Sequence, residues 1–205
     1  TLSYSWAPSG GTAATATGLL QGTYTCTITD TKSCTKTQTV SVTQPAAITS
    51  SVSSQTNIAC NGAMTGAATI AASGGTPAYT YAWAPSGGTA ATATGLAAGT
   101  YTCTITDANA CTKTQTVTLT EATPITSTVT NYSDVACYGG SNGAVMLTIT
   151  GGTGTKTYSW APSGGTGSTA TGLAAGTYTC TITDANACVA TQTVTILQPD
   201  AITSV

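Results

Sequence analysis

Apolar and hydroxyl side chains alternate along most of this chain, and no stretch shows the spacing of an amphipathic helix. Threonines separate Tyr101, Cys103 and Ile105 from one another, and Val117 and Leu119 alternate with threonines in the same way. This period of two predicts strands that have one buried face and one solvated face. Threonine, valine and isoleucine suit such strands because they are β-branched.

Other segments of the chain show the same alternation. The residues on their apolar faces are Ile48, Ser50 and Val52, then Ala68, Ile70 and Ala72, then Tyr79, Tyr81 and Trp83. Turn sequences rich in glycine and proline separate these segments, for example residues 74–77 and 85–88. Six or seven short strands at spacings of about 8–12 residues predict an all-β, immunoglobulin-like β-sandwich.

A tight hairpin turn is expected at Asp107-Ala108-Asn109-Ala110, with the asparagine in the left-handed conformation. A turn at this place puts Cys103 opposite Gln115 on the next strand. Tyr101-Thr102-Cys103, with Trp83 upstream, resembles the core tyrosine, cysteine and tryptophan of immunoglobulin domains. We expect these residues and their equivalents to pack in the core: Trp6, Trp83, Trp160, Tyr24, Tyr101 and Tyr178.

The whole pattern recurs with a period of 77 residues. Trp6, Trp83 and Trp160 are 77 residues apart, and the segment Ala7–Leu19 is identical to Ala84–Leu96. This period is longer than that of solenoid repeats, which is about 20–50 residues, and is close to the size of a small domain. The sequence therefore predicts tandem domains, each with its own core.

Placing the junctions at Gln44-Pro45, Ala122-Thr123 and Gln198-Pro199 divides the chain into four parts. These are the C-terminal part of an incomplete repeat (1–45), two complete β-sandwich repeats (46–122 and 123–199), and the first strand of a following repeat (200–205). The incomplete repeat is expected to expose Tyr4, Trp6, Tyr24 and Val40, because its opening strands are missing. Short junctions that contain proline predict an extended, stiff rod that advances about 30–40 Å per unit.

Charge and composition exclude several classes of function. Only 5% of the residues are charged, the net charge is −2, and histidine is absent. Nucleic-acid binding and membrane insertion are not expected, because there is neither a basic cluster nor a long apolar run. No nucleophile–base pair can be assembled, so no enzyme activity is expected. Asp107 and Asn109 offer too few oxygens for calcium and are assigned to the turn. We expect no metal and no cofactor.

The eight cysteines favour disulfides and an extracellular location. In a strictly up-and-down order of strands, Cys60 and Cys111 lie at the same end of one domain. We therefore expect the disulfides Cys60–Cys111 and Cys137–Cys188. Cys26, Cys103 and Cys180 lie on the apolar face of their strand, where each is either a buried free thiol or an inter-chain cross-link.

Threonines form a ladder on the opposite face of these strands. Thr102, Thr104 and Thr106 face the same side as a row on the next strand, which runs from Thr112 to Thr120. Arrays of this kind occur on ice-binding and sugar-binding surfaces. Threonine also suits any solvated strand face, so the ladder is consistent with a purely structural role.

The segments Cys60-Asn61-Gly62, Gly74 to Trp83 and Gly95 to Cys111 resemble the SprB-type repeat of gliding-bacteria surface adhesins, and the third unit carries the same frame. The resemblance implies a secreted protein of the bacterial cell surface that serves adhesion or gliding. We expect a structural extracellular fibre or adhesin stalk, with copies of itself as partners. The alternative is a carbohydrate- or ice-binding module that uses the threonine faces or loops, with surface polysaccharide as partner.

Overall fold

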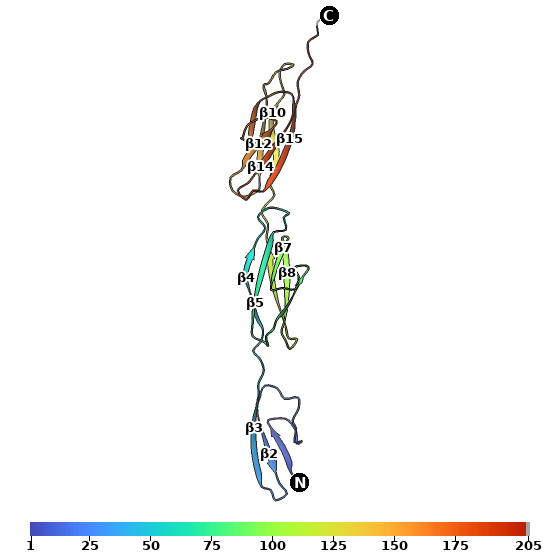
Figure 1. Cartoon of the computed structure of the whole chain (residues 1–205), viewed down its shortest axis with the longest axis vertical. Coiled ribbons are helices and arrows are strands. Elements are labelled where there is room, and N and C mark those ends of the chain that lie inside the picture. Colours follow the sequence, from blue (N-terminus) through green and yellow to red (C-terminus); the bar gives the residue numbers. More distant parts are fainter. Residues whose placement is uncertain (204–205) are drawn as a thin grey trace.

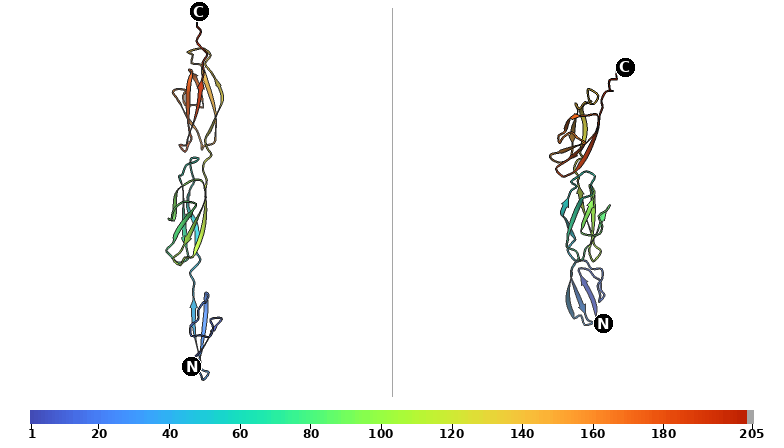
Figure 2. Two further views of the ribbon diagram at one scale, coloured as in Figure 1. Left: turned by 90° about the vertical axis from the view of Figure 1, so that its right-hand side faces the viewer. Right: turned by 45° about the horizontal axis from the view of Figure 1, so that its top comes forward.

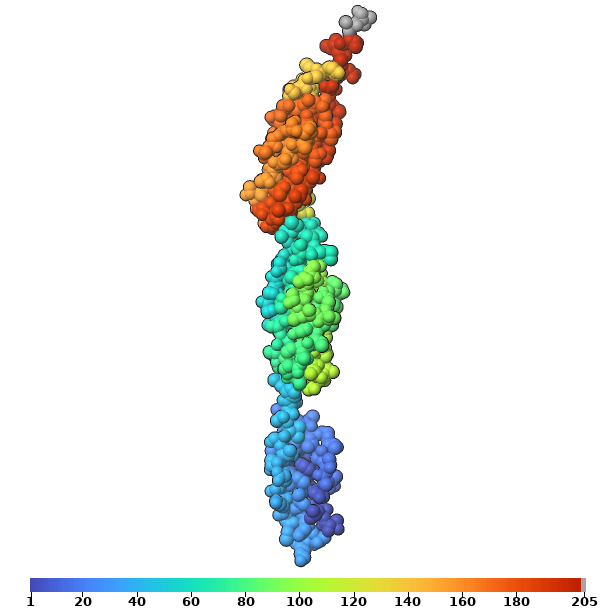
Figure 3. Space-filling model, viewed as in Figure 1, coloured from blue at the N-terminus to red at the C-terminus, as the bar shows by residue number. Residues whose placement is uncertain are grey.

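The computed structural model describes residues 1–203, which form three bodies in line from the N-terminus to the C-terminus (Figure 1). Two further views show the same extended arrangement (Figure 2). In the space-filling view a narrow neck separates the first and middle bodies, and the third body lies against the tip of the middle one (Figure 3). All regular elements of the described residues are strands. These residues contain no helix long and apolar enough to cross a membrane. The expected strand at 200–205 includes Ser204 and Val205, which lie outside the described residues, and residues 200–203 form no strand.

Each of the two later bodies consists of two antiparallel sheets of three strands. In the middle body the sheets have the orders β4-β5-β7 and β6-β8-β9. The strands are β4 (Thr49–Thr56), β5 (Gly66–Ser73), β6 (Thr80–Ala84), β7 (Thr92–Leu96), β8 (Gly99–Thr106) and β9 (Thr112–Leu119). This arrangement corresponds to sheets ABE and CFG of an immunoglobulin-like sandwich, so the predicted fold class is confirmed.

The third body repeats this topology with sheets β10-β11-β13 and β12-β14-β15. Its strands are β10 (Thr126–Ser133), β11 (Gly143–Thr150), β12 (Thr157–Ala161), β13 (Thr169–Leu173), β14 (Gly176–Thr183) and β15 (Val189–Ile196). The first body has one sheet, β1-β2-β3, formed by β1 (Ser3–Ala7), β2 (Gly22–Thr29) and β3 (Thr35–Val42).

Two separate cores lie between the paired sheets. The alternation in β8 buries Tyr101, Cys103 and Ile105, and the sheet opposite contributes Ala68 and Ile70. In the strand register Cys103 lies opposite Trp83 of β6 and opposite Gln115 of β9. The position opposite Gln115 is the one that the hairpin turn predicts. The equivalent core of the third body is formed by residues between 125 and 196. The two sandwiches therefore do not share an interior.

Each body anchors its aromatic core residues by hydrogen bonds to the backbone. The Tyr101 hydroxyl donates to the carbonyl of Ala97 (3.1 Å), and the Trp83 indole N–H donates to Ala90 (2.9 Å). A tyrosine that bonds to backbone a few residues upstream is the tyrosine corner of immunoglobulin-like domains. These bonds let large aromatic side chains lie in a small core with their polar atoms satisfied.

The first body is less exposed than expected. Tyr24 is buried, with 5% of its surface exposed: its ring lies beside Gly22, and its hydroxyl donates to the carbonyl of Leu20 (3.0 Å). The expectation that Tyr24 is exposed is therefore wrong. Val40 is exposed, and Tyr4 and Trp6 are only half-buried, since no second sheet covers them. Trp6 is thus not a full core residue, in contrast to Trp83 and Trp160.

An aspartate organises the hairpin turn between β8 and β9. Asp107 Oδ1 accepts the backbone N–H groups of Asn109 and Cys111 (both 2.9 Å), and its Oδ2 accepts that of Thr76 (2.9 Å). The left-handed residue is Ala110, with φ of 63°, and not Asn109 as expected. The Asn109 side chain instead donates to the Thr76 hydroxyl (2.9 Å), which ties two loops together.

These hydrogen bonds favour the ionised carboxylate. The N–H of Thr76 contributes most to lowering the pKa of Asp107, burial partly opposes this effect, and the N–H groups of Cys111 and Asn109 add to it. The pKa of Asp184, the equivalent residue of the third body, is lowered in the same way, first by the N–H of Thr153.

We predict that Gly87→Ala destabilises the middle body. Gly87 has φ of 129°, and a Cβ atom there would lie 2.9 Å from Trp83 Cβ and 3.0 Å from Ala93 Cβ. The combined strain and overlap should lower the free energy of unfolding by about 2–4 kcal/mol. Gly88→Ala is the matched control, because Gly88 also has positive φ but an added Cβ meets no atom within 4 Å. Equal losses for the two variants in chemical denaturation would contradict a role for the Trp83 contact.

We predict that acid weakens both sandwiches through the two aspartates. Because the pKa of both aspartates is lowered in the folded state, their ionised form stabilises the folded protein at pH values above the unfolded pKa of about 3.9. This contribution is lost as the pH falls from that value through the folded pKa. Asp107→Asn with Asp184→Asn should lower the melting temperature at pH 7 and reduce its difference between pH 7 and pH 3. Asp200→Asn, at an exposed residue, is the control. An undiminished difference in the double variant would rule out this origin.

Candidate functional site: the repeat junction and the threonine ladders

The segment that leaves the middle body is fixed to the loop between β4 and β5. The N–H of Ile58 donates to Thr120 (2.8 Å), and the N–H of Ala122 donates back to Ile58 (3.1 Å). The Glu121 carboxylate accepts the N–H of Gly62 (2.6 Å). The exit of the chain from this sandwich therefore has a defined direction.

The third body contacts the same region from the other side. The N–H of Gly152 donates to the carbonyl of Thr123 (3.0 Å), so the linker is hydrogen-bonded to both bodies. The side-chain amide of Asn186, in the turn between β14 and β15, donates to Ala59 of the middle body (3.4 Å).

A disulfide closes this junction. Cys60 in the β4–β5 loop is bonded to Cys188 in the β14–β15 turn, with 5.4 Å between their Cα atoms and a sequence separation of 128 residues. The expected pairs Cys60–Cys111 and Cys137–Cys188 are therefore wrong. The cross-link joins two neighbouring sandwiches, whereas the expected pairs each lie within one sandwich.

The directions of the strands explain this difference. The expected pairing assumed that every strand reverses the direction of the one before it. In the structure β7 runs parallel to β4, because both are antiparallel to β5. The parallel bridge between Ile58 and Glu121, which follow β4 and β9, shows that β9 also runs parallel to β4, and β6 has the same direction because β6 and β9 are both antiparallel to β8. Cys111, at the start of β9, therefore lies at the opposite end of the body from Cys60.

The remaining cysteines form two groups among the described residues. Cys26, Cys103 and Cys180 are unpaired and buried, and burial raises the pKa of the Cys103 and Cys180 thiols. Thiols of this kind pack as small apolar side chains and react poorly. Cys34, Cys111 and Cys137 are unpaired and exposed.

The threonine ladders lie on the outer face of the β6-β8-β9 sheet. Four directly paired positions carry threonine on both strands: Thr100 with Thr118, Thr102 with Thr116, Thr104 with Thr114, and Thr106 with Thr112. The hydroxyls of Thr100 and Thr118 are 3.1 Å apart. The third body has similar pairs, with 3.2 Å between the hydroxyls of Thr179 and Thr193. Each ladder is an array of hydroxyl and methyl groups on two neighbouring strands.

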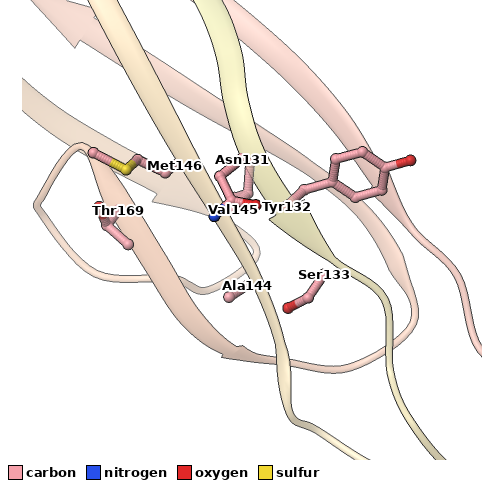
Figure 4. A pocket seen from close by; sticks show the side chains of 7 residues that line it. All are labelled: Asn131, Tyr132, Ser133, Ala144, Val145, Met146 and Thr169. Carbon is pink, nitrogen blue, oxygen red and sulfur yellow. The ribbon is translucent and has the colours of Figure 1, made fainter.

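A pocket of about 190 Å³ lies on the outer face of the other sheet of the third body, where it is lined by Asn131, Tyr132, Met146 and Thr169 among others (Figure 4). The Tyr132 ring points away from Met146 and Thr169, so the pocket remains open. The middle body has Gln55 and Thr69 at the positions of Tyr132 and Met146. This pocket is therefore particular to one body and is not a property of the repeat.

The acidic residues offer no place for a metal. The described residues contain no group of three histidine, cysteine, aspartate or glutamate side chains that could hold one. The oxygens of Asp107 and Asp184 are occupied by the backbone N–H groups of their turns.

Solved structures similar to this chain include multi-domain proteins from viruses and animals. The three N-terminal domains of the bacteriophage RB49 highly immunogenic outer capsid protein are 13% identical, cover 97% of this chain and 89% of their own, and give a TM-score of 0.43. The N-terminal eight immunoglobulin domains of Down syndrome cell adhesion molecule are 15% identical, cover 88% of this chain and 28% of their own, and give a TM-score of 0.42. Extracellular domains 3–5 of Drosophila OTK are 13% identical, cover 97% of this chain and 86% of their own, and give a TM-score of 0.35.

No curated protein sequence matches the chain. A repeat family does match, at residues 52–88 and 129–165, two segments that are offset by the 77-residue period. Each segment runs from the first strand of a sandwich to the loop after its tryptophan. The resemblance to the SprB repeat is thus confirmed, with one matched segment in the middle body and one in the third body, and it supports a repeat protein of the cell surface.

Proposed function

We propose that this chain is a structural segment of an extracellular stalk or filament on a bacterial surface. The junction between the middle and third bodies carries the proposal. Backbone hydrogen bonds, an amide contact and the Cys60–Cys188 disulfide hold two sandwiches end to end. A junction built in this way transmits direction from one body to the next, so repetition adds length.

The surface chemistry supports the same proposal. With 5% charged residues, neighbouring rods would repel one another little, and their hydroxyl-rich faces could lie side by side. The disulfide fits an oxidising, extracellular location. Multivalent adhesion or gliding would follow from many such units acting together.

Carbohydrate or ice binding is the second candidate function, and the threonine ladders are the observation that favours it. Neighbouring strands lie about 4.8 Å apart, and residues two apart on a strand are about 6.7 Å apart, so each ladder forms a regular lattice of hydroxyls. A regular lattice could match repeating groups on a polysaccharide or on ice. The same threonines also suit a solvated strand, which is why we place this function second.

One experiment separates the two functions. The whole chain is tested on a glycan array and for inhibition of ice recrystallisation, beside Thr104→Lys with Thr114→Lys, which places two charges in the middle of one ladder. We expect no binding and no inhibition by either protein, together with rods in electron micrographs. Binding that the double substitution weakens would favour the second function instead, with the remainder carried by the unaltered ladder of the third body.

We predict that the disulfide limits bending at the junction between the middle and third bodies. Cys60→Ser should widen the distribution of angles between these two bodies in electron micrographs, and should shorten the largest dimension measured by small-angle X-ray scattering. Beads spaced about 30–40 Å apart should remain visible, because each sandwich keeps its own core.

Cys111→Ser is the matched control for this prediction, because Cys111 is exposed and unpaired. The junction between the first and middle bodies is an internal reference, since its linker has a hydrogen bond from Gly75 to Ala46 (2.6 Å) but no disulfide. An unchanged distribution of angles in Cys60→Ser would contradict a role for the disulfide in stiffness.

A further inference from the structure

We propose that the Asn61-Gly62 segment at the repeat junction modifies itself, with the Glu121 carboxylate as the catalytic base. The backbone nitrogen of Gly62 attacks the side-chain amide of Asn61, and the succinimide that results is hydrolysed to aspartate or isoaspartate. The inference goes beyond the proposed stalk and does not depend on it, because it concerns chemistry within one loop of the chain.

Glu121 lies where a base for the Gly62 nitrogen is needed. Its carboxylate, in the segment that follows β9, accepts the N–H of Gly62 at 2.6 Å. A general base must lie about 2.6–3.2 Å from the atom whose proton it takes, and this contact meets that condition. A weak nucleophile becomes reactive when an adjacent base accepts its proton. The hydrogen bond therefore places Glu121 to activate the nitrogen.

The Asn61 amide is free to meet this nitrogen. Asn61 is exposed and lines the hollow of the junction, and its side chain takes part in no hydrogen bond among residues 1–203. The two reacting groups belong to neighbouring residues, so the reaction is intramolecular and needs no encounter. Exposed side chains change rotamer within nanoseconds, so the side chain of Asn61 does not limit the rate.

Gly62 leaves space for the ring that forms. The turn from Cys60 to Ala63 is closed by a hydrogen bond of 3.1 Å, and Gly62 has φ of 75°, a conformation that suits glycine. A Cβ atom added at Gly62 would meet no atom within 4 Å, so the surroundings of this peptide are open. Glycine also lacks a side chain that would hinder the approach of its own nitrogen to the amide carbon.

The same dipeptide occurs once more, at Asn142-Gly143, in surroundings that prevent the reaction. Asn142 Oδ1 accepts the N–H of Ala136 (3.0 Å), which holds the side-chain amide in place. Gly143 is buried at the start of β11, where an added Cβ would lie 2.7 Å from Ile196 Cγ2 and 2.9 Å from the carbonyl oxygen of Leu173. We expect Asn142 to remain unchanged, which makes it an internal control.

The third body keeps the hydrogen bond but lacks the reactive amide. Gly139 donates its N–H to the side chain of Gln198 (2.9 Å), and these two residues stand 77 positions after the donor and acceptor of the middle body. Tyr138 stands at the position of Asn61. A glutamine in place of the glutamate therefore preserves the hydrogen bond, although a carboxamide is not a base.

The reaction needs only water besides the chain itself. Glu121 takes the proton of the Gly62 nitrogen, and this nitrogen forms a bond to Asn61 Cγ. The side-chain nitrogen receives the proton and leaves as ammonia. Water then opens the ring: attack at the former side-chain carbonyl gives aspartate, and attack at the backbone carbonyl gives isoaspartate. In sum, one amide and one water yield one carboxyl group and one ammonia.

Conversion changes the junction in two ways. The new carboxylate lies in the loop whose backbone Glu121 holds, and like charges at short range repel each other. The isoaspartate form also adds one methylene group to the backbone beside Cys60, which carries the disulfide. The product therefore marks the age of a junction by one added negative charge.

The test is incubation of the whole folded chain at neutral pH, followed by peptide mapping with mass spectrometry and by labelling with protein isoaspartate methyltransferase. We expect the amide of Asn61 to be replaced by a carboxyl group and Asn142 to be unchanged. In an unfolded chain both dipeptides would react, so an unchanged Asn142 also shows that the protein is folded. Asn61→Gln should abolish the labelling, because ring closure from the longer side chain is slow.

Glu121→Gln separates the base from the hydrogen bond, because a glutamine keeps an acceptor for the Gly62 N–H. We expect this variant to slow the conversion of Asn61 by about 10-fold, which is less than the usual effect of general-base catalysis, about 10²–10⁴-fold, since a carboxylate is a weak base. Asp200→Asn, which removes an exposed carboxylate of the third body, is the control and should leave the rate unchanged.

Three outcomes would overturn the inference. Conversion in Glu121→Gln that is as fast as in the wild-type chain, or faster, would show that the hydrogen bond restrains the nitrogen and does not activate it. Conversion of Asn142 at the rate of Asn61 would show that the loop gives no advantage. An unchanged Asn61 in the incubated wild-type chain would show that the site is inert, and would leave the stalk proposal intact.

Discussion

In each complete sandwich the first and last strands run in the same direction, and the rest of the molecule depends on this constraint. The chain enters at one end of the body along β4 and leaves at the other end along β9. The next sandwich therefore begins where the previous one ends, and tandem repetition yields a line of bodies (Figure 1). Had the two strands been antiparallel, entry and exit would lie together and the same repeats would form a cluster.

Much of the fold could be predicted from the sequence because it depends on local patterns. Alternation along β8 and β9 determines which side chains are buried, and the position of the hairpin turn determines that Cys103 faces Gln115. The 77-residue period predicts that both complete bodies share one topology. These features need only neighbouring residues and the geometry of a pleated strand.

The disulfide could not be predicted in this way, because it depends on the path of the loop at 85–91. That loop takes the chain from one sheet to the other without reversing its direction, so β6 and β7 run the same way. No residue pattern in the loop predicts this path. Ala110 in place of Asn109 at the left-handed position has a similar cause. The asparagine side chain is used by a partner from a distant loop, Thr76, and this tertiary contact overrides the local preference.

Cross-linking between bodies suggests that each sandwich is stable without a disulfide of its own. Cys103 and Cys180 take no part in a bond between sheets, and the inner faces are held instead by packing and by the anchored tyrosines and tryptophans. Hydrogen bonds such as that from Ser50 to Gln115 (3.0 Å) link the two sheets at their edge.

The position of the disulfide also determines how tension travels through the chain. A pull on the two ends passes along β4 to Cys60, crosses the sulfur–sulfur bond to Cys188, and continues along β15. The backbone from 61 to 187 lies outside this path, so most of both sandwiches bears no load while the bond is intact. Under force the rod behaves as a covalent spine with one extended strand per body, to which the folded cores are attached at the side.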